Sequence, residues 1–318
     1  MNNIDALPAP YDSQSGRELL SAVLVMLIAH RGGTVRHAGN TLPAFEYAMA
    51  RGCEGAELDV HLSADGTLIV HHDDRLDPAT TRTVDGRRLN TDKSYRIANL
   101  TLAALRDYEI LTPDAVQVAD TGHPIPTLDD VISLVQQRSK TFRLVIEIKS
   151  PDLLHAGDDD TQPLVDAVLN RITTHGFDDR AILCGFDWRA LRYARRCRPD
   201  IPLWLTTLPF DWLDPNHSPA SDLPCDAGML ERYRAAFAQD APWFDGFRPA
   251  NAQEAGAAVH AAGGDLWFGY YTDVTPSAVA HAHRQGVAAG AWSVALGDAG
   301  KRADLMKRNL DAVCIDYF

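Results

Sequence analysis

Short apolar runs alternate with helix-like segments along most of this 318-residue chain, and that alternation limits the possible folds more than any other feature. Alternating strands and helices indicate a parallel sheet whose strands are joined by helices. Without the return strand of one hairpin, the predicted strands are residues 23–29, 55–60, 143–148, 181–185, 202–206, 266–270, 287–293 and 312–316. The helices predicted between them are residues 41–51, 127–139, 162–175, 187–197, 229–238, 252–262, 275–285 and 297–309.

Eight strands with intervening helices favour a closed (β/α)8 barrel of the α/β class. A doubly wound open sheet is the alternative, and such a sheet usually carries a glycine-rich GxGxxG or GxxxxGK turn after its first strand. Residues 30–33, which follow the first predicted strand, match neither pattern. We therefore predict one barrel domain over residues 23–318, preceded by an N-terminal tail over residues 1–22.

Two segments interrupt the repeat of strands and helices. Residues 74–126 are rich in turn-forming residues and contain one clear helical stretch, at about 101–108. Residues 207–227 hold four prolines and Trp212. Long loops in compact domains commonly serve as lids or binding loops, so we predict loop insertions in both places.

Composition restricts the partners of the chain. The formal net charge of −13 disfavours nucleic acid and anionic membranes, which bind clustered basic residues. The longest apolar run, residues 19–29, is too short to span a bilayer and follows no basic cluster. Five widely spaced cysteines without a CxxC pair indicate reduced thiols. We expect a cytoplasmic protein with a small-molecule substrate and no stable membrane association, in an oligomeric state that the sequence leaves open.

A predicted hairpin brings together a carboxylate and an imidazole. Side chains alternate along a strand, so Glu57 and Asp59 share one face of the strand over residues 55–60. Asp65 and Gly66 have the composition of a two-residue hairpin turn. With that turn, antiparallel pairing sets Asp59 directly opposite His72, and directly opposed side chains interact.

Chemically reactive residue types follow several of the predicted strands. In a (β/α)8 barrel the functional site lies at the C-terminal ends of the strands. The residues placed there are His30, Arg31, Glu57, Asp59, Glu147, Lys149, Asp187, Trp204, Tyr270, Tyr271, Trp292 and Asp316. The carboxylates at 57, 59 and 147 form an oxygen-rich set suited to Ca2+ or Mg2+. Carboxylates can bind a divalent cation, and nearby histidines can transfer protons. Together these residue types are typical of metal-assisted hydrolysis of a phosphate ester.

An ordered set of short motifs resembles the glycerophosphodiester phosphodiesterase family, of the phospholipase C-like phosphodiesterase superfamily. The order and spacing hold from about residue 27 to the C-terminus, which makes the set far more specific than any one motif. The matching segments are residues 29–33, 40–42, 57–60, 65–66, 71–73, 82–86, 125–128, 147–149, 291–294 and 315–317.

The resemblance implies a distorted (β/α)8 barrel and a metal-dependent enzyme. Glu57, Asp59 and Glu147 would bind the divalent metal, and His30 and His72 would be the catalytic acid and base, in an order that the sequence leaves open. The family hydrolyses deacylated phospholipids, such as glycerophosphocholine or glycerophosphoethanolamine, to glycerol 3-phosphate and an alcohol. The head group that this chain prefers is not determined by the motifs.

Further roles follow from the same resemblance. Arg31 and Lys149 would hold phosphate oxygens, and Asn40 would lie in the substrate pocket. The chain departs from the family pattern beside Asn40, because the family usually reads Pro-Glu-Asn-Thr where this chain reads Ala38-Gly39-Asn40-Thr41 and so lacks the glutamate. The missing carboxylate leaves open the metal and the charge network beside the first histidine.

Aromatic residues suggest the form of the substrate pocket. We expect residues 207–227 to form a lid, with Trp204, Trp212, Tyr270 and Trp292 as pocket residues. Aromatic walls suit an apolar or cationic group, including choline. A short polar substrate is the first expectation. A lysophospholipase D or sphingomyelinase D-like activity is the alternative on the same fold, and a non-catalytic phosphodiester-binding barrel is the alternative of another class.

Overall fold

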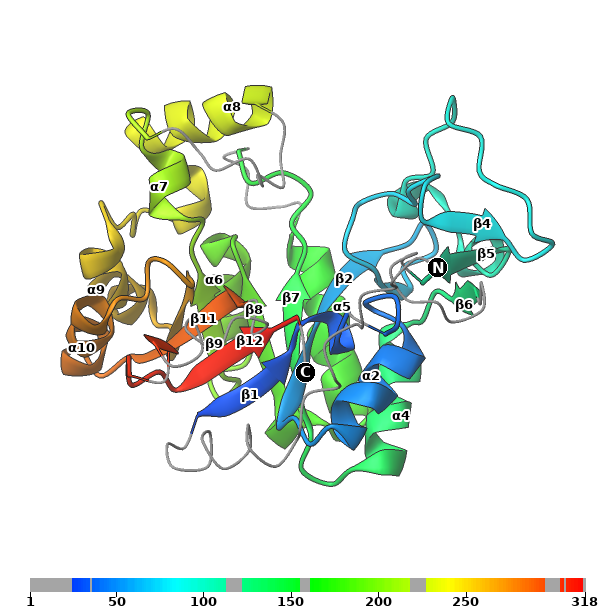
Figure 1. Ribbon diagram of the computed structural model, residues 1–318, viewed down its shortest axis with the longest axis horizontal. Helices are drawn as coiled ribbons and strands as arrows, with labels where there is room; N and C mark the ends of the chain where they lie inside the picture. Colours follow the sequence, from blue (N-terminus) through cyan, green and yellow to red (C-terminus); the bar gives the residue numbers. More distant parts are fainter. Residues whose placement is uncertain are drawn as a thin grey trace, which may run out of the picture.

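The computed structural model describes residues 25–34, 36–112, 122–154, 161–217, 227–294, 304–305 and 307–316. Within them, parallel strands close into a barrel, because β1 pairs both with β2 and with β12. The barrel strands are β1 Met26–Ala29, β2 Gly55–Leu62, β7 Arg143–Ile148, β8 Ala181–Gly185, β9 Leu203–Thr206, β10 Leu266–Tyr270, β11 Ala288–Val294 and β12 Ala312–Ile315. The predicted (β/α)8 barrel is confirmed (Figure 1).

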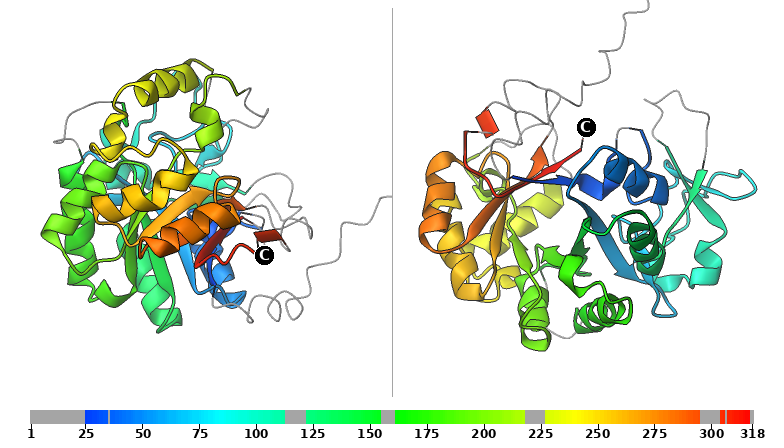
Figure 2. Two further views of the ribbon diagram at one scale, coloured as in Figure 1. Left: turned by 90° about the vertical axis from the view of Figure 1, so that its left-hand side faces the viewer. Right: turned by 90° about the horizontal axis from the view of Figure 1, so that it is seen from below.

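Helices cover the outside of the sheet, as both views in Figure 2 show. They are α2 Leu42–Ala50, α4 Leu128–Arg138, α5 Gln162–Thr174, α6 Trp188–Cys197, α9 Ala252–Ala262 and α10 Pro276–Arg284, whereas α8 Ala227–Ala238 is set off from the sheet, at the top of Figure 1. Local sequence explains some boundaries: α4 begins at a capping box in which Thr127 and Asp130 bind each other's backbone N–H groups. The predicted tail and most of the helix expected over 297–309 lie outside the described residues.

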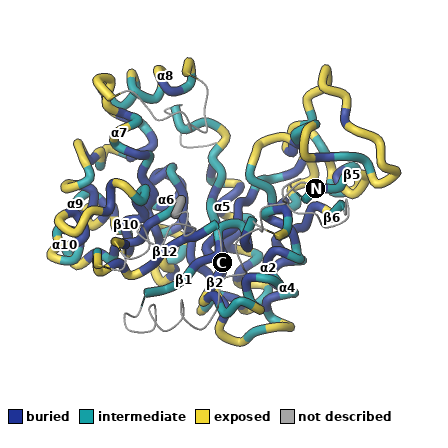
Figure 3. The backbone as a smooth tube through the Cα atoms, viewed as in Figure 1, coloured by how far each residue is buried: buried dark blue, intermediate teal, exposed yellow. Residues whose placement is uncertain are grey.

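Strand alternation separates two environments. On β2, Leu58 and Val60 pack outward against the helices, whereas Glu57 and Asp59 belong to the opposite face. The barrel interior below the site is a compact apolar cluster. Its buried members are Ile28, Val145, Ile182, Cys184, Trp204, Leu266, Phe268, Ala312 and Cys314. Figure 3 shows this buried centre against the exposed outer loops.

The hairpin after β2 departs from its predicted register by one residue. Strand β3 Leu68–Val70 pairs with β2 so that Val60 lies opposite Val70, and the N–H of His71, rather than of His72, donates to Asp59 O at 3.1 Å. The prediction that Asp59 lies directly opposite His72 was therefore wrong.

The turn chemistry explains the shift. A two-residue type I′ turn needs positive φ at both central positions, but of Asp65 and Gly66 only Gly66 has it, at 75°. The Ser63 N–H donates to Thr67 O at 2.9 Å, which closes a three-residue loop instead. A one-residue slip moves the paired partners of the whole return strand.

The segment over 74–126 is more ordered than the predicted loop. It forms a three-stranded antiparallel sheet of β4 Thr81–Thr83, β5 Tyr108–Leu111 and β6 Gly122–Pro124, with the short helix α3 Leu102–Leu105. We call residues 74–126 the insertion; its residues 113–121 are not described. A separate apolar cluster that includes Ile97, Leu105 and Ile110 holds it together. Its strands are too short and polar for the sequence pattern to separate them from turns.

The second interruption, residues 207–227, is described up to residue 217 and contains the short helix α7 Phe210–Leu213. No helix in the described residues has both the length and the apolar character that a bilayer crossing requires. The four described cysteines, Cys53, Cys184, Cys197 and Cys314, are free thiols, as predicted, and Cys225 lies outside the described residues.

Candidate active site

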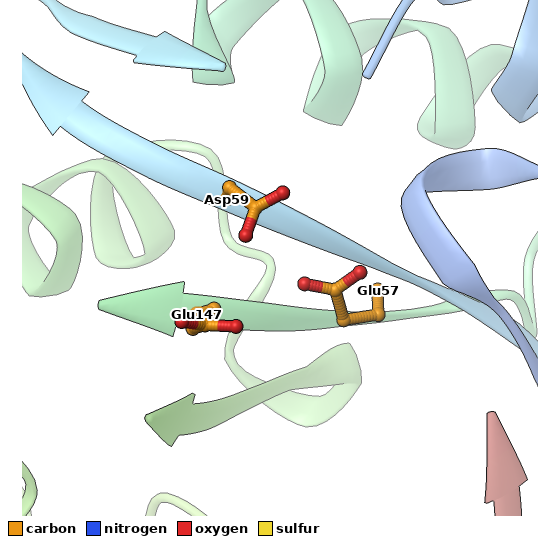
Figure 4. Close-up of side chains that lie close together, drawn as sticks. All are labelled: Glu57, Asp59 and Glu147. Atoms are coloured by element: carbon orange, nitrogen blue, oxygen red, sulfur yellow. The ribbon is translucent and has the colours of Figure 1, made fainter. Parts of the chain in front are cut away.

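Three carboxylates converge at the C-terminal ends of two neighbouring strands. Glu57 and Asp59 come from β2 and Glu147 comes from β7, where Asp59 and Glu147 are partners in register. One oxygen from each carboxylate lies within 4.8 Å of the others. Figure 4 shows the three side chains facing the same space between the strands. The structure thus brings together the set that the sequence predicted as metal ligands.

Glu57 is the member whose surroundings most clearly favour a cation. It is 3% exposed, its Oε2 accepts the N–H of Arg31 at 3.1 Å, and its Oε1 has no hydrogen-bond partner. Burial, with the charges of Asp59 and Glu147 adding to it, raises the pKa of Glu57 well above its ordinary value. A bound cation would satisfy the orphaned oxygen and reverse this shift, so the donor set fits a hard divalent metal.

Lys149 neutralises the other two carboxylates. Its Nζ lies 2.9 Å from Asp59 Oδ1 and 2.7 Å from Glu147 Oε1. Burial alone would raise the pKa of Asp59, but Lys149, Arg31 and other neighbours hold it well below its ordinary value. For Lys149, burial opposes the charged form, yet Asp59 and Glu147 raise its pKa above the usual range.

Asn40 fixes the orientation of Asp59. Its Nδ2 donates to Asp59 Oδ2 at 2.7 Å, and the Asp59 N–H donates to Asn40 Oδ1 at 3.3 Å. Asn40 and Arg31 both adopt left-handed backbone conformations, with φ of 61° and 50°, and the Asn40 N–H donates to Arg31 O. This tight loop places Arg31 Nε 3.5 Å from Asp59 Oδ2.

Gly39 lies in the same loop, against the Arg31 side chain. A Cβ atom there would come within 2.9 Å of Arg31 Cβ and 3.2 Å of Thr34 Cγ2. The side chain of Arg31 thus occupies the space next to Gly39, the position at which the family usually has a glutamate.

His30 follows β1 directly and is held by a carboxylate from the last strand. Its Nδ1 forms a hydrogen bond with Asp316 Oδ1, and its Nε2 lies 3.9 Å from Glu57 Oε2. The pairing of Ala29 with Ile315 explains this contact, because the next residues of the two parallel strands are His30 and Asp316. The sequence analysis placed Asp316 at the strand ends but assigned it no role. A closed barrel pairs its last strand with its first, and that pairing could have predicted that Asp316 lies beside His30.

His72 is held in a similar way by its chain neighbour. Its Nδ1 lies 2.7 Å from Asp73 Oδ1, and its backbone carbonyl contacts His61 Nε2 at 3.1 Å. The positive charge that His72 carries when protonated is one of the smaller influences that lower the pKa of Asp59. The adjacent His71 is different, because burial lowers its pKa to about 4.

The predicted pocket aromatics divide into two groups. Trp204 is 5% exposed and packs in the barrel interior, with its ring 5.3 Å from that of Phe268. Tyr270 lies near the strand ends, 4.9 Å from Trp292 and 5.5 Å from Trp212. The structure therefore groups Tyr270, Trp292 and Trp212 and places Trp204 below them. Phe186, which the sequence analysis missed, contacts Trp292 with ring centroids 5.5 Å apart.

Fold and side chains together define an α/β barrel with a site able to hold a cation at the C-terminal ends of its strands. The model of the glycerophosphoryl diester phosphodiesterase family matches residues 30–318. The chain belongs to this family, which confirms the resemblance found in the motifs.

Individual relatives agree with this assignment. The chain is 31% identical over 180 residues to the glycerophosphodiester phosphodiesterase of Caldanaerobacter subterraneus, covering 57% of this chain and 65% of the relative. It is 31% identical over 186 residues to that of Bacillus altitudinis, covering 58% of this chain and 67% of the relative. The matched segments thus span about two thirds of these relatives.

Solved structures extend the likeness over nearly the whole chain. A Silicibacter pomeroyi protein named for glycerophosphoryl diester phosphodiesterase superposes with a TM-score of 0.72 at 26% identity, covering 92% of this chain and 90% of its own. An Oleispira antarctica phosphodiesterase, solved in complex with the product sn-glycerol-3-phosphate, superposes with a TM-score of 0.64 at 21% identity. That match covers 94% of this chain and 95% of the other, and it supports the fold.

Proposed function

We propose that this protein hydrolyses glycerophosphodiesters to glycerol 3-phosphate and an alcohol in a metal-dependent reaction. The observation that carries the proposal is the cluster of Glu57, Asp59 and Glu147, whose carboxylates converge in a member of this family, with His30 Nε2 3.9 Å from Glu57 Oε2. The Oleispira antarctica relative bound to sn-glycerol-3-phosphate supports the choice of product.

The metal that suits the cluster is Ca2+ or Mg2+, because all three side chains offer carboxylate oxygens. When bound, such a cation supplies positive charge that polarises a phosphoryl oxygen. Glu57, Asp59 and Glu147 would hold it, and Asn40 keeps Asp59 oriented for this role.

His30 and His72 would move the protons of the reaction. Each imidazole has its Nδ1 against an aspartate, Asp316 or Asp73, which fixes the orientation of the ring and leaves Nε2 for the substrate. One histidine takes the proton of the attacking hydroxyl, from water or from the glycerol 2-hydroxyl. The bond from phosphorus to the alcohol oxygen breaks, and the other histidine donates a proton to that oxygen. Attack by the 2-hydroxyl would give a cyclic phosphate that water then opens.

Arg31 and Lys149 would offset the negative charge of the phosphate. Lys149 lies against Asp59 and Glu147, and Arg31 Nε approaches Asp59, so both cations border the carboxylate cluster. Cations already held in a partly buried site stabilise developing charge without reorganisation at the moment of reaction.

The test is a hydrolysis panel with the purified protein and added Ca2+ or Mg2+, with a chelated sample beside it. The substrates are glycerophosphocholine, glycerophosphoethanolamine, glycerophosphoglycerol and lysophosphatidylcholine. We expect turnover of at least one glycerophosphodiester, release of glycerol 3-phosphate, and loss of turnover after chelation. Full activity after exhaustive chelation would contradict the metal dependence.

The same panel separates the two alternatives. A tenfold or greater preference in kcat/KM for lysophosphatidylcholine would instead identify a lysophospholipase D-like enzyme. Binding of phosphate or metal without turnover of any substrate would identify a non-catalytic barrel.

A further inference from the structure

A cavity of about 340 Å³ opens beside the carboxylate cluster. It shares Glu147 and Lys149 with that cluster, so a substrate whose phosphate lies at Lys149 would extend into it. Four separate parts of the chain line it: the insertion, the loop after β7, the loop after β8, and helix α8. The remaining lining residues are Arg96, Ile148, Ser150, Pro151, Asp152, Leu153, Phe186, Asp187, Met229, Arg232 and Tyr233.

The charges of this cavity are unevenly compensated. Within the protein, Lys149 neutralises Glu147, and the buried Asp187 accepts from Arg189 at 2.8 Å. Arg96 contacts Asp74 at 3.1 Å in a pair that is about half exposed on both sides. Such an exposed pair is weak and leaves the guanidinium available to a ligand.

Arg232 supplies a second guanidinium, from α8. It is exposed, and no described carboxylate lies within ion-pair distance of it. Arg96 belongs to the insertion, so the two cations reach the same cavity from segments that lie far apart in sequence. Figure 1 shows the insertion and α8 on the same side of the barrel.

Ser150 adds an unsatisfied polar atom. Its Oγ is buried and has no hydrogen-bond partner among the described residues. A buried hydroxyl without a partner is uncommon in folded proteins and calls for an explanation such as a ligand. Ser150 lines the cavity next to Lys149, and a rotation about its Cα–Cβ bond would turn the hydroxyl from this closed position toward a bound substrate.

We propose that this cavity binds the alcohol head group of the substrate and that Arg96 and Arg232 select head groups bearing an acidic group, such as serine. The proposal rests on the phosphodiesterase function proposed above. A guanidinium binds a carboxylate with two parallel hydrogen bonds, which a head group without an acidic group cannot form.

Glycerophosphoserine and glycerophosphoethanolamine test the proposal as a matched pair, because they differ by one carboxylate. We expect kcat/KM for the serine compound to exceed that for the ethanolamine compound by about tenfold or more, as is usual for one charge-assisted contact. Arg232→Gln should lower kcat/KM for the serine compound at least fivefold more than for the ethanolamine compound, and Arg96→Gln should act in the same direction. Arg284→Gln, at an exposed arginine on α10, is the control and should leave the ratio unchanged.

The outcomes separate the head-group proposal from the proposed function. A wild-type ratio at or below one, or a ratio that neither Arg232→Gln nor Arg96→Gln changes, would overturn the head-group proposal while hydrolysis itself stands. Absence of hydrolysis for every glycerophosphodiester would overturn the proposed function and the head-group proposal with it. Equal melting temperatures of the variants and the wild type would show that a changed ratio does not arise from unfolding.

Discussion

Two halves of the barrel share the same parallel-strand backbone but carry different side chains at the ends of their strands. In the half formed by β1, β2 and β7, the strand ends carry the buried carboxylates Glu57 and Asp59 and, beside them, Glu147. In the half formed by β9, β10 and β11, the strand ends carry the rings of Tyr270 and Trp292 in edge-to-face contact. The acidic half places like charges close together in a buried site, whereas the aromatic half packs rings against one another.

The difference shows where folding and chemistry conflict. Aromatic contacts stabilise the fold directly. Buried carboxylates oppose folding unless a cation or a proton neutralises them, which is why the pKa of Glu57 is raised. Removing charge from the acidic half should therefore improve stability and abolish activity, while changes in the aromatic half should alter both only modestly.

The largest expected effect is that of Glu57→Gln. This variant should lower kcat/KM by about 1,000-fold or more, because it would remove a carboxylate that we propose as a metal ligand. Folding raises the pKa of Glu57. The contribution of this carboxyl to the free energy of unfolding is therefore lost as the pH rises through the raised pKa. A glutamine does not ionise, so the variant does not lose stability in this way.

Thermal unfolding at pH 8 provides the second measurement on Glu57→Gln. Without metal, the variant should melt above the wild type, and Ca2+ or Mg2+ should raise the melting temperature of the wild type only. Glu231→Gln, at an exposed position of α8, is the control and should keep both activity and the response to metal. A metal-dependent shift that survives in Glu57→Gln would show that the cation binds elsewhere.

Replacing either of the histidines proposed as acid and base is the next test of the acidic half. His30→Ala and His72→Ala should each lower kcat at least ~100-fold, on the usual scale for acid–base groups. Steady-state kinetics on a substrate from the hydrolysis panel measures the loss. His281→Ala, on the outer helix α10, serves as the control. Near-normal turnover in both active-site variants would contradict the two-histidine mechanism.

The aspartates behind the histidines should have smaller effects. Asp316→Asn and Asp73→Asn should each lower kcat by about tenfold with little change in KM, because the aspartate orients the ring and does not touch the substrate. The separation of kcat from KM is the measurement. An increase in KM with an unchanged kcat would instead indicate that these aspartates act on substrate binding.

A smaller effect is expected in the aromatic half. Trp292→Phe keeps a ring against Tyr270 and Phe186, so it should change kcat/KM by less than about fivefold and leave the melting temperature within a few degrees of the wild type. A decrease in kcat/KM comparable to that of the histidine variants would mean that Trp292 takes part in the reaction. The division between an acidic half and an aromatic half would then not hold.

The smallest effect is a pH-dependent change in stability at Asp273. This carboxylate is 6% exposed and accepts the N–H of Phe210 at the start of α7. Burial raises its pKa to about 7, so its stabilising contribution is present below its unfolded value near 4 and is lost as the pH rises through 7. Asp273→Asn should raise the melting temperature by about 3 °C at pH 8 and leave it nearly unchanged at pH 4. Equal shifts at both pH values would contradict this account.

Much of the barrel could be predicted because its signals are local. The apolar runs that became β1, β2, β7 to β12 and the helices between them follow from short-range periodicity. Alternation along β2 likewise put Glu57 and Asp59 on one face, and the motifs identified the family. These properties depend on residues within a few positions of one another, so the linear sequence contains them.

Other features were decided only by the tertiary structure. The His30–Asp316 pair exists because β12 closes onto β1, and the register beyond Gly66 depends on backbone torsions that the Asp-Gly pair does not specify alone. The cavity beside Lys149 is lined by residues of both the insertion and α8, which only the folded chain brings to the same place. Contacts between residues hundreds of positions apart form only when the whole chain packs, because local propensity carries no information about which distant side chain will fill the neighbouring space.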